Sequence, residues 1–241
     1  MKKAFFLLLL SVACLESRAQ IMFKTEYFGT SAYRITEGDR DEKVGNSKGS
    51  AVVYQGGINV PLSVKPGKNN RPVMWAVSAG GAYTKLDNRH FTEPLVIGEI
   101  LNLALNLNHL RPLNERWSLL VSIGAGIYMP GTRFSDIRFR NVLANAEAIF
   151  IYHLKPHLEV GGGLAMNNSF GYPMVFPAFY FNWTTEGRYA VKISMLDGFE
   201  MSVGYQASLN LSLNLIAAMN GQMALLKQNG KDKMFSHQYL V

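Results

Sequence analysis

The sequence predicts an all-β protein, specifically an antiparallel transmembrane β-barrel of about twelve strands, with ten strands as the alternative. Three observations predict this fold: apolar residues alternate with polar or small residues, many of the alternating segments are long, and short connections alternate with long ones. The chain has 241 residues, of which 48% are apolar and 17% charged, so its composition excludes a disordered protein. No run of about 18 apolar residues follows the N-terminal segment, which argues against a helical membrane bundle.

Residues 1–19 have the pattern of a signal peptide. Lys2 and Lys3 form a positive start, residues 5–13 are apolar, and Ser17 and Ala19 are small residues at the two positions that signal peptidase recognises. We therefore expect cleavage after Ala19, export to the outer membrane, and a barrel domain that spans residues 20–241.

A lipoprotein is the alternative for this N-terminal segment. The single cysteine of the chain, Cys14, follows Ser11-Val12-Ala13, and it would then become the acylated first residue. On the favoured interpretation the exported part of the chain has no cysteine, so we expect neither a disulfide framework nor thiol catalysis.

Alternation with a period of two is clearest in residues 97–110. Leu101, Leu103, Leu105 and Leu107 share one parity, and Asn or Ala residues occupy the other. A helix would instead place apolar residues three and four positions apart, so this segment is predicted to be a strand. The predicted strands are 21–34, 49–64, 72–85, 97–110, 116–129, 138–154, 157–167, 174–183, 188–196, 199–206, 211–227 and 233–241.

Strand lengths and connections favour a membrane barrel over a soluble sheet. A tilted strand needs roughly 9 to 11 residues to cross a bilayer, and many of the predicted segments reach this length. The connections at 111–115, 155–156, 184–187 and 207–210 are short, whereas those at 35–48 and 86–96 are longer and charged. Outer-membrane barrels have short periplasmic turns and longer external loops, which matches this order. The short hairpin near Asp197 and Gly198 leaves ten strands as the alternative.

Aromatic residues are expected to mark the membrane interface. Under this layout they lie near strand ends and on the apolar parity of their strands, where they would point at lipid beside the headgroups. The predicted interface residues are Trp75, Trp117, Trp183, Tyr189 and Tyr205.

Charged residues on the other parity are expected to face the lumen and to pair with one another. Three basic and three acidic residues balance there, and pairing avoids the cost of an isolated charge shielded from water. The predicted lumen-facing charges are Lys24, Glu26, Glu147, Arg188, Lys192 and Glu200. Twelve strands leave open whether the interior is filled or conducts a solute.

No motif predicts a catalytic, metal or cofactor site. The five histidines form no ligand cluster and are interpreted as solvated interface residues, and Ser236 and His237 would face opposite sides of a strand. Residues 161–163 are three glycines that open a strand rather than a helix, so they do not predict a phosphate loop. Lys and Arg are scattered rather than massed on one face, so we expect no nucleic-acid partner. We therefore do not expect an enzyme or a cofactor.

The chain resembles the outer-membrane β-barrel proteins of Bacteroidota-type bacteria, many of which are domains of unknown function. The residues that carry this resemblance are Ser17-Arg18-Ala19-Gln20 and the turn-strand units Asn108-His109-Leu110-Arg111-Pro112-Leu113-Asn114-Glu115-Arg116-Trp117-Ser118-Leu119 and His153-Leu154-Lys155-Pro156-His157-Leu158-Glu159-Val160. The resemblance implies outer-membrane lipid, lipopolysaccharide and the barrel assembly machinery as partners. Such barrels usually end in an aromatic residue, whereas this chain ends Tyr239-Leu240-Val241.

The expected role is that of an outer-membrane component, either a narrow solute pore or a structural or surface-interaction protein. Two alternatives remain open, a membrane-bound lipid-modifying enzyme and a soluble periplasmic barrel that binds an apolar ligand. A soluble barrel would carry its apolar parity inward, so the direction of Leu103 and Leu213 distinguishes it from a membrane barrel.

Overall fold

The computed structural model describes residues 19–37, 40–67, 71–90, 97–167, 174–185, 187–194, 199–208, 211–228 and 231–240. The predicted signal peptide, except for Ala19, and the possible acylation site Cys14 lie outside these residues. The C-terminal residue Val241 also lies outside them.

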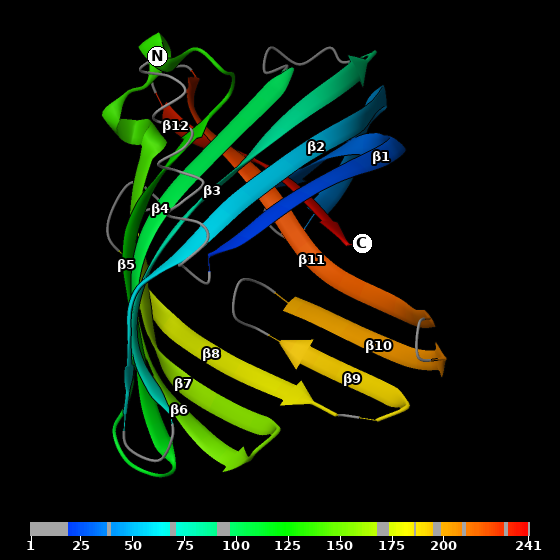
Figure 1. Ribbon diagram of the computed structural model, residues 1–241. Coiled ribbons are helices and arrows are strands. Elements are labelled where there is room, and N and C mark those ends of the chain that lie inside the picture. Colours follow the sequence, from blue (N-terminus) through cyan, green and yellow to red (C-terminus); the bar gives the residue numbers. More distant parts are fainter. Residues whose placement is uncertain are drawn as a thin grey trace, which may run out of the picture.

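Twelve strands form one antiparallel sheet in which each strand pairs with the next along the chain (Figure 1). The strands are β1 (Gln20–Glu37), β2 (Arg40–Pro66), β3 (Pro72–Arg89), β4 (Glu99–Pro112), β5 (Trp117–Met129), β6 (Val142–Lys155), β7 (Leu158–Asn167), β8 (Met174–Thr184), β9 (Tyr189–Ser194), β10 (Phe199–Ser208), β11 (Leu211–Gln228) and β12 (Lys231–Leu240). Two short 3-10 helices, η2 (Phe134–Asp136) and η3 (Phe139–Asn141), precede β6.

The all-β antiparallel prediction is confirmed, and each of the twelve predicted segments overlaps one strand. The alternative of ten strands is wrong for the described residues, because β9 and β10 are separate strands that pair from Tyr189 opposite Tyr205 to Ser194 opposite Glu200. Within the described part of the chain, no helix is long and apolar enough to cross a membrane.

The long loop predicted at 35–48 is wrong. The β1–β2 ladder continues through this segment to Glu37 opposite Arg40, and residues 38–39 lie outside the described part. The sequence pattern missed this extension because the segment is polar, so its hydropathy does not alternate. Backbone pairing does not require an apolar face when a hairpin extends into solvent.

Apart from register shifts at residues 28–34, 61–63, 153–155 and 206–208, the ladder keeps one parity of each strand on the same face of the curved sheet. One face is exposed and apolar, and it includes Leu105, Ile123, Phe179 and Leu213, which are 57%, 53%, 66% and 60% exposed. The opposite face holds buried polar residues such as Thr84 and Ser122. We call it the inner face, because Ala224 of β11 packs against buried residues of this face. Neighbouring side chains of a strand point to opposite faces, so the register determines this separation.

The second half of β11 leaves β10 and packs against the inner face of β2 to β4. The β10–β11 pairing ends at Met219, whereas β11 continues to Gln228 beside β12 (Figure 1). Ala224 of β11 packs with Ala51, Leu86 and Ile100, which are all buried on the inner face. This segment of β11 therefore fills part of the interior.

Asn102 of β4 supplies the hydrogen bonds that a neighbouring strand would otherwise provide to β11. Its Nδ2 donates to the carbonyl oxygen of Met223 over 2.6 Å, and its Oδ1 accepts from the backbone N–H of Met223 over 3.1 Å. Asn141 likewise donates to the carbonyl oxygen of Leu225 over 2.8 Å. These side-chain amides stabilise backbone groups that would be costly to leave unpaired in the interior.

The ladder between β12 and β1 that would close the sheet is absent among the described residues. The structure therefore establishes one antiparallel sheet of twelve strands for the described residues.

Replacing Asn102 with alanine is expected to destabilise the fold by about 1–3 kcal/mol, because the N–H and C=O of Met223 lose their partners. Urea unfolding measures this change. Asn108→Ala is the matched control, since Asn108 donates only to the Ser78 side chain, over 2.7 Å. Equal destabilisation by the two variants would contradict the role given to Asn102.

Candidate functional site

Aromatic side chains form cross-strand pairs on the exposed face near one end of the sheet. Trp75 stacks on His109 with 4.0 Å between ring centroids, Trp117 lies 4.9 Å from Tyr152, and Tyr189 lies 5.1 Å from Tyr205. Trp183 is also exposed there, and it lies opposite Leu158. We call these residues the aromatic belt. The belt contains the five aromatic residues that the sequence predicts for a membrane interface.

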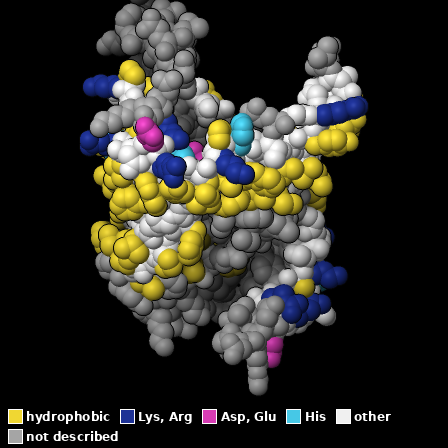
Figure 2. Space-filling view, turned by 90° about the horizontal axis from the view of Figure 1, so that it is seen from below, with side chains coloured by type: hydrophobic (Ala, Val, Ile, Leu, Met, Phe, Trp, Pro, Cys, Tyr) yellow, Lys and Arg dark blue, Asp and Glu magenta, His cyan; other side chains and the backbone are white. Residues whose placement is uncertain are grey.

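Charged residues gather along one border of the exposed apolar face. Figure 2 shows a band of hydrophobic side chains with Lys, Arg, His, Asp and Glu beside that border. Two arginines contact tyrosines of the belt: Arg116 donates to the Tyr152 hydroxyl over 3.3 Å, and Arg188 donates to the Tyr205 hydroxyl over 2.9 Å. The Arg188 guanidinium lies 5.4 Å from the centre of the Tyr205 ring, which is a cation–π contact.

This position of Arg188 differs from the lumen-facing position that the sequence predicts. Arg188 takes this position because it precedes β9, where the ladder ends. Its side chain is not held between two neighbouring strands, and it reaches the Tyr205 ring.

The other predicted lumen charges lie on the inner face, and four of them form two ion pairs. The Lys24 Nζ is 2.6 Å from a Glu26 carboxylate oxygen, and the Lys192 Nζ is 3.0 Å from a Glu200 oxygen. Glu147 is half-buried between Ser122 and Ala165 of the neighbouring strands. The interior therefore holds close charge pairs.

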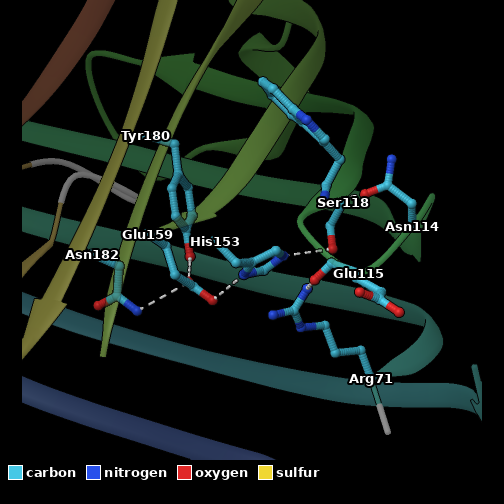
Figure 3. A network of polar contacts seen from close by, with 9 residues as sticks. Arg71, Asn114, Glu115, Ser118, His153, Glu159, Tyr180 and Asn182 are labelled. Atoms are coloured by element: carbon cyan, nitrogen blue, oxygen red, sulfur yellow. Dashed lines mark hydrogen bonds and ion pairs between the residues drawn. The ribbon is translucent and has the colours of Figure 1, made fainter. Parts of the chain in front are cut away.

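A network of polar side chains crosses β5 to β8 on the inner face, behind the aromatic belt (Figure 3). Ser118 Oγ and His153 Nε2 are 2.8 Å apart, and His153 Nδ1 is 2.8 Å from Glu159 Oε1. The other Glu159 oxygen accepts hydrogen bonds from the Tyr180 hydroxyl over 2.7 Å and from Asn182 Nδ2 over 3.3 Å. We call these five residues the inner polar network.

Two tight turns set the register that brings these residues together. The Asn114 side chain accepts the N–H groups of Arg116 and Trp117, which starts β5 so that Ser118 points inward. A turn at residues 156–157 joins β6 to β7 and places His153 directly opposite Glu159. The three side chains thus lie on adjacent strands and on one face.

Glycine provides space for the apolar layer beside this network. A Cβ atom on Gly161 would lie 2.7 Å from the Phe150 carbonyl oxygen and 3.1 Å from the Tyr180 Cβ. Tyr180 packs with Ile149 and Ile151 in a buried cluster on the inner face. The three-glycine segment therefore serves close packing within a strand, and its first residue lies against the polar network.

The order of hydrogen bonds matches that of a nucleophile, a base and an orienting acid. A carboxylate only accepts hydrogen bonds, so Glu159 keeps a proton on His153 Nδ1. In the neutral imidazole, Nε2 then accepts the Ser118 hydroxyl proton. Chemically, such an arrangement can activate a serine for acyl transfer.

Burial favours a structural role for the same residues. Ser118 is 3% exposed and the His153 side chain 10% exposed, so neither presents an open surface to a substrate. A pocket lined by Trp117, Tyr152 and Gly162 among others lies on the opposite face of the sheet. Fully paired polar groups of this kind stabilise one packing arrangement of an interior.

The sequence interpretation of the histidines is wrong for His153, which is a member of the inner polar network rather than a solvated residue. His109 and His157 are placed differently, His109 on Trp75 and His157 exposed in a turn. Strand parity was the signal that could have found these residues. Ser118, His153 and Glu159 each stand next to an outward-facing residue of their strand, so each side chain is expected to point inward. Within the described residues, no group of three or more His, Cys, Asp or Glu side chains is placed to hold a metal ion.

A protein-family model, the domain of unknown function DUF6268, matches residues 15–241. No curated protein and no solved structure shows significant similarity to the chain.

Replacing Glu159 with glutamine is expected to lower stability by about 1.5–3 kcal/mol, the range for hydrogen bonds to a charged group. The glutamine amide offers one acceptor oxygen where the carboxylate serves three donors. Urea unfolding measures the loss, and Glu115→Gln in the exposed turn is the control, expected to change stability by less than about 0.5 kcal/mol. Unchanged stability of Glu159→Gln would mean that the network contributes nothing to folding.

Proposed function

The chain belongs to the DUF6268 family of domains of unknown function, and we propose from its geometry that it is an outer-membrane β-barrel protein with a filled interior. Its role in this proposal is structural or surface-interacting, with outer-membrane lipid and lipopolysaccharide as its surroundings, and it is not an open channel. This proposal keeps the localisation expected from the signal peptide.

One observation carries the membrane assignment: the exposed face of the sheet is apolar and ends in the aromatic belt. Leu215 and Phe179 are 77% and 66% exposed, which would be unfavourable over so wide a surface in water. In a bilayer the same face meets acyl chains, and Trp and Tyr rings at the headgroup level are typical of membrane barrels. The inner face, with its polar network and ion pairs, would be poorly suited to lipid.

Closure of the sheet is part of the proposal. A bilayer offers no hydrogen bonds to a free strand edge, so β1 and β12 would have to pair or be covered there. An even number of strands allows an antiparallel meander to close in this way with both ends on one side of the membrane.

The interior favours a filled barrel over a solute pore. The second half of β11 packs against Ala51, Leu86 and Ile100 on the inner face, and Ile149, Ile151 and Tyr180 form a second buried cluster. Polar side chains on the inner face are paired with one another, as in His153 with Glu159, whose side chains are 10% and 24% exposed. A wide water-filled path would instead need solvated polar walls.

Fluorophores on cysteines introduced at Leu103 and Leu213 are expected to be quenched by brominated lipid, because both side chains belong to the exposed apolar face. A fluorophore at Ser122, which is buried on the inner face, serves as the control and is expected to be protected. Strong quenching at Ser122 with protection at Leu103 and Leu213 would overturn the membrane assignment and favour a soluble barrel that binds an apolar ligand.

Conductance across planar bilayers tests whether the interior is filled. We expect the purified protein to insert without producing a steady conductance. A steady conductance that changes on Glu147→Gln or Lys192→Gln would contradict the filled interior and favour a narrow solute pore.

A lipid-modifying enzyme is the second candidate, and the specific observation in its favour is the Ser118–His153–Glu159 geometry. In that role Ser118 Oγ would attack an acyl carbonyl while its proton passes to His153 Nε2, and the leaving alcohol would later take that proton. Opening of the inner face would be required first, because Ser118 is buried.

For this second candidate, an alkyl fluorophosphonate is expected to label the folded protein at Ser118, as identified by mass spectrometry of tryptic peptides. Labelling should disappear in Ser118→Ala and fall sharply in His153→Ala, because the serine is unreactive without its base. Ser122→Ala, a change at another buried inner-face serine, should label normally. A folded protein that remains unlabelled would exclude the enzyme.

A further inference from the structure

An apolar groove of about 640 Å³ lies on the exposed face, immediately beside the aromatic belt. It is lined by Trp117, Phe150, Tyr152, Val160, Gly161 and Gly162, from β5, β6 and β7. The groove belongs to the face that meets lipid in the proposed function, and no residue of the inner polar network is among the residues that line it.

The groove exists because Gly162 has no side chain between two large ones. Gly162 lies opposite Phe150 on β6 and opposite Phe179 on β8. A Cβ atom built on Gly162 would meet only the Ala178 carbonyl oxygen, at 4.0 Å, so the space above this glycine is open. The two flanking phenylalanines are 49% and 66% exposed and form apolar walls.

The belt end of the groove is polar and cationic. Trp117 and Tyr152, which line the groove, also form one of the belt pairs, and the Tyr152 hydroxyl accepts a hydrogen bond from Arg116. Arg116 is exposed, and among the described residues no carboxylate pairs with its guanidinium. Lys155 and His157, in the turn that joins β6 to β7, are exposed as well.

We propose that this groove binds a glycerophospholipid with an anionic headgroup, one acyl chain lying over Gly162 and the phosphate at Arg116. An apolar channel that ends at aromatic rings and a cation complements the order of parts in such a lipid, and guanidinium groups bind phosphate through paired N–H donors. The inference rests on the proposed membrane location and adds a specific lipid site to it.

The second arginine of the belt offers a matched comparison. Arg188 contacts Tyr205, and the Tyr189 ring lies beside the Tyr205 ring. This part of the belt therefore also combines an aromatic pair with an arginine. Its residues do not line the groove. A belt arginine without a groove should attract anionic lipid only weakly.

Trp117 provides the reporter, because its ring lines the groove. In a protein with Trp75→Phe and Trp183→Phe, the remaining tryptophan is Trp117. The protein is placed in phosphatidylcholine vesicles that contain a bromine-labelled lipid, either phosphatidylglycerol or phosphatidylcholine. We expect Trp117 to be quenched with about fivefold preference for the anionic lipid, the factor that corresponds to one arginine near the membrane surface.

Two variants separate the chain and headgroup contributions. Gly162→Leu fills the groove and should reduce quenching by both lipids, whereas Arg116→Gln should keep the quenching and remove the anionic preference. Gly56→Leu and Arg188→Gln are the controls; Gly56 is an outward glycine of β2 where a Cβ would make ordinary contacts from 3.7 Å. Heat-dependent mobility on a denaturing gel verifies that each variant is folded.

The outcomes distinguish this inference from the proposed function. Equal quenching by the two lipids, unchanged in Gly162→Leu and Arg116→Gln, would leave the membrane assignment intact and overturn the lipid site. Absence of quenching by either lipid, with the protein outside the vesicle fraction, would overturn the proposed function itself. If Arg188→Gln removes the preference for the anionic lipid as fully as Arg116→Gln does, the preference belongs to the belt as a whole. That result would also overturn the lipid site.

Discussion

The register of the antiparallel ladder is the constraint on which the rest of this structure depends. Side chains alternate between the two faces of every strand, so each pairing must keep the parity of the one before it. Leu103 lies opposite Ile127, and Asn102 lies opposite Tyr128, one position away on the other face. A shift of one residue in this pairing would place the leucines of β4 inside and its asparagines outside. The exposed apolar face, the aromatic belt and the inner polar network all depend on this register.

The interior is organised by local pairing of polar groups around apolar layers. Asn102 bonds both backbone groups of Met223, and Glu159 accepts hydrogen bonds from Tyr180, Asn182 and His153. Satisfied groups of this kind cost little to bury, whereas an unpaired buried donor or acceptor costs about 1–3 kcal/mol. The same principle explains why the Ser118–His153–Glu159 geometry is compatible with a purely structural role despite its resemblance to a catalytic arrangement.

The exposed face is the part of the structure on which the proposed function rests. Its apolar residues, the belt and the groove at Gly162 fit a lipid environment, and they lie on the opposite side of the sheet from the buried network. A membrane role and a specific lipid site thus depend on different residues from a catalytic role. Variants at Gly162 and Arg116 therefore test the lipid site without replacing Ser118 or His153.

The sequence alone predicted the approximate positions of the strands, with ten strands left open beside twelve, and it predicted the two faces and the outward position of Trp75, Trp117 and Trp183. Alternation along a strand is a local property, so it can be recognised from neighbouring residues. The sequence did not determine the β1–β2 extension, in which polar residues pair without an alternating pattern. It also missed the contact of Asn102 with Met223, 121 residues away, and of His153 with Ser118, 35 residues away. Those contacts depend on turn geometry and on the curvature that folds β11 inward. Only the tertiary structure decides which residues of one inner face meet across the interior.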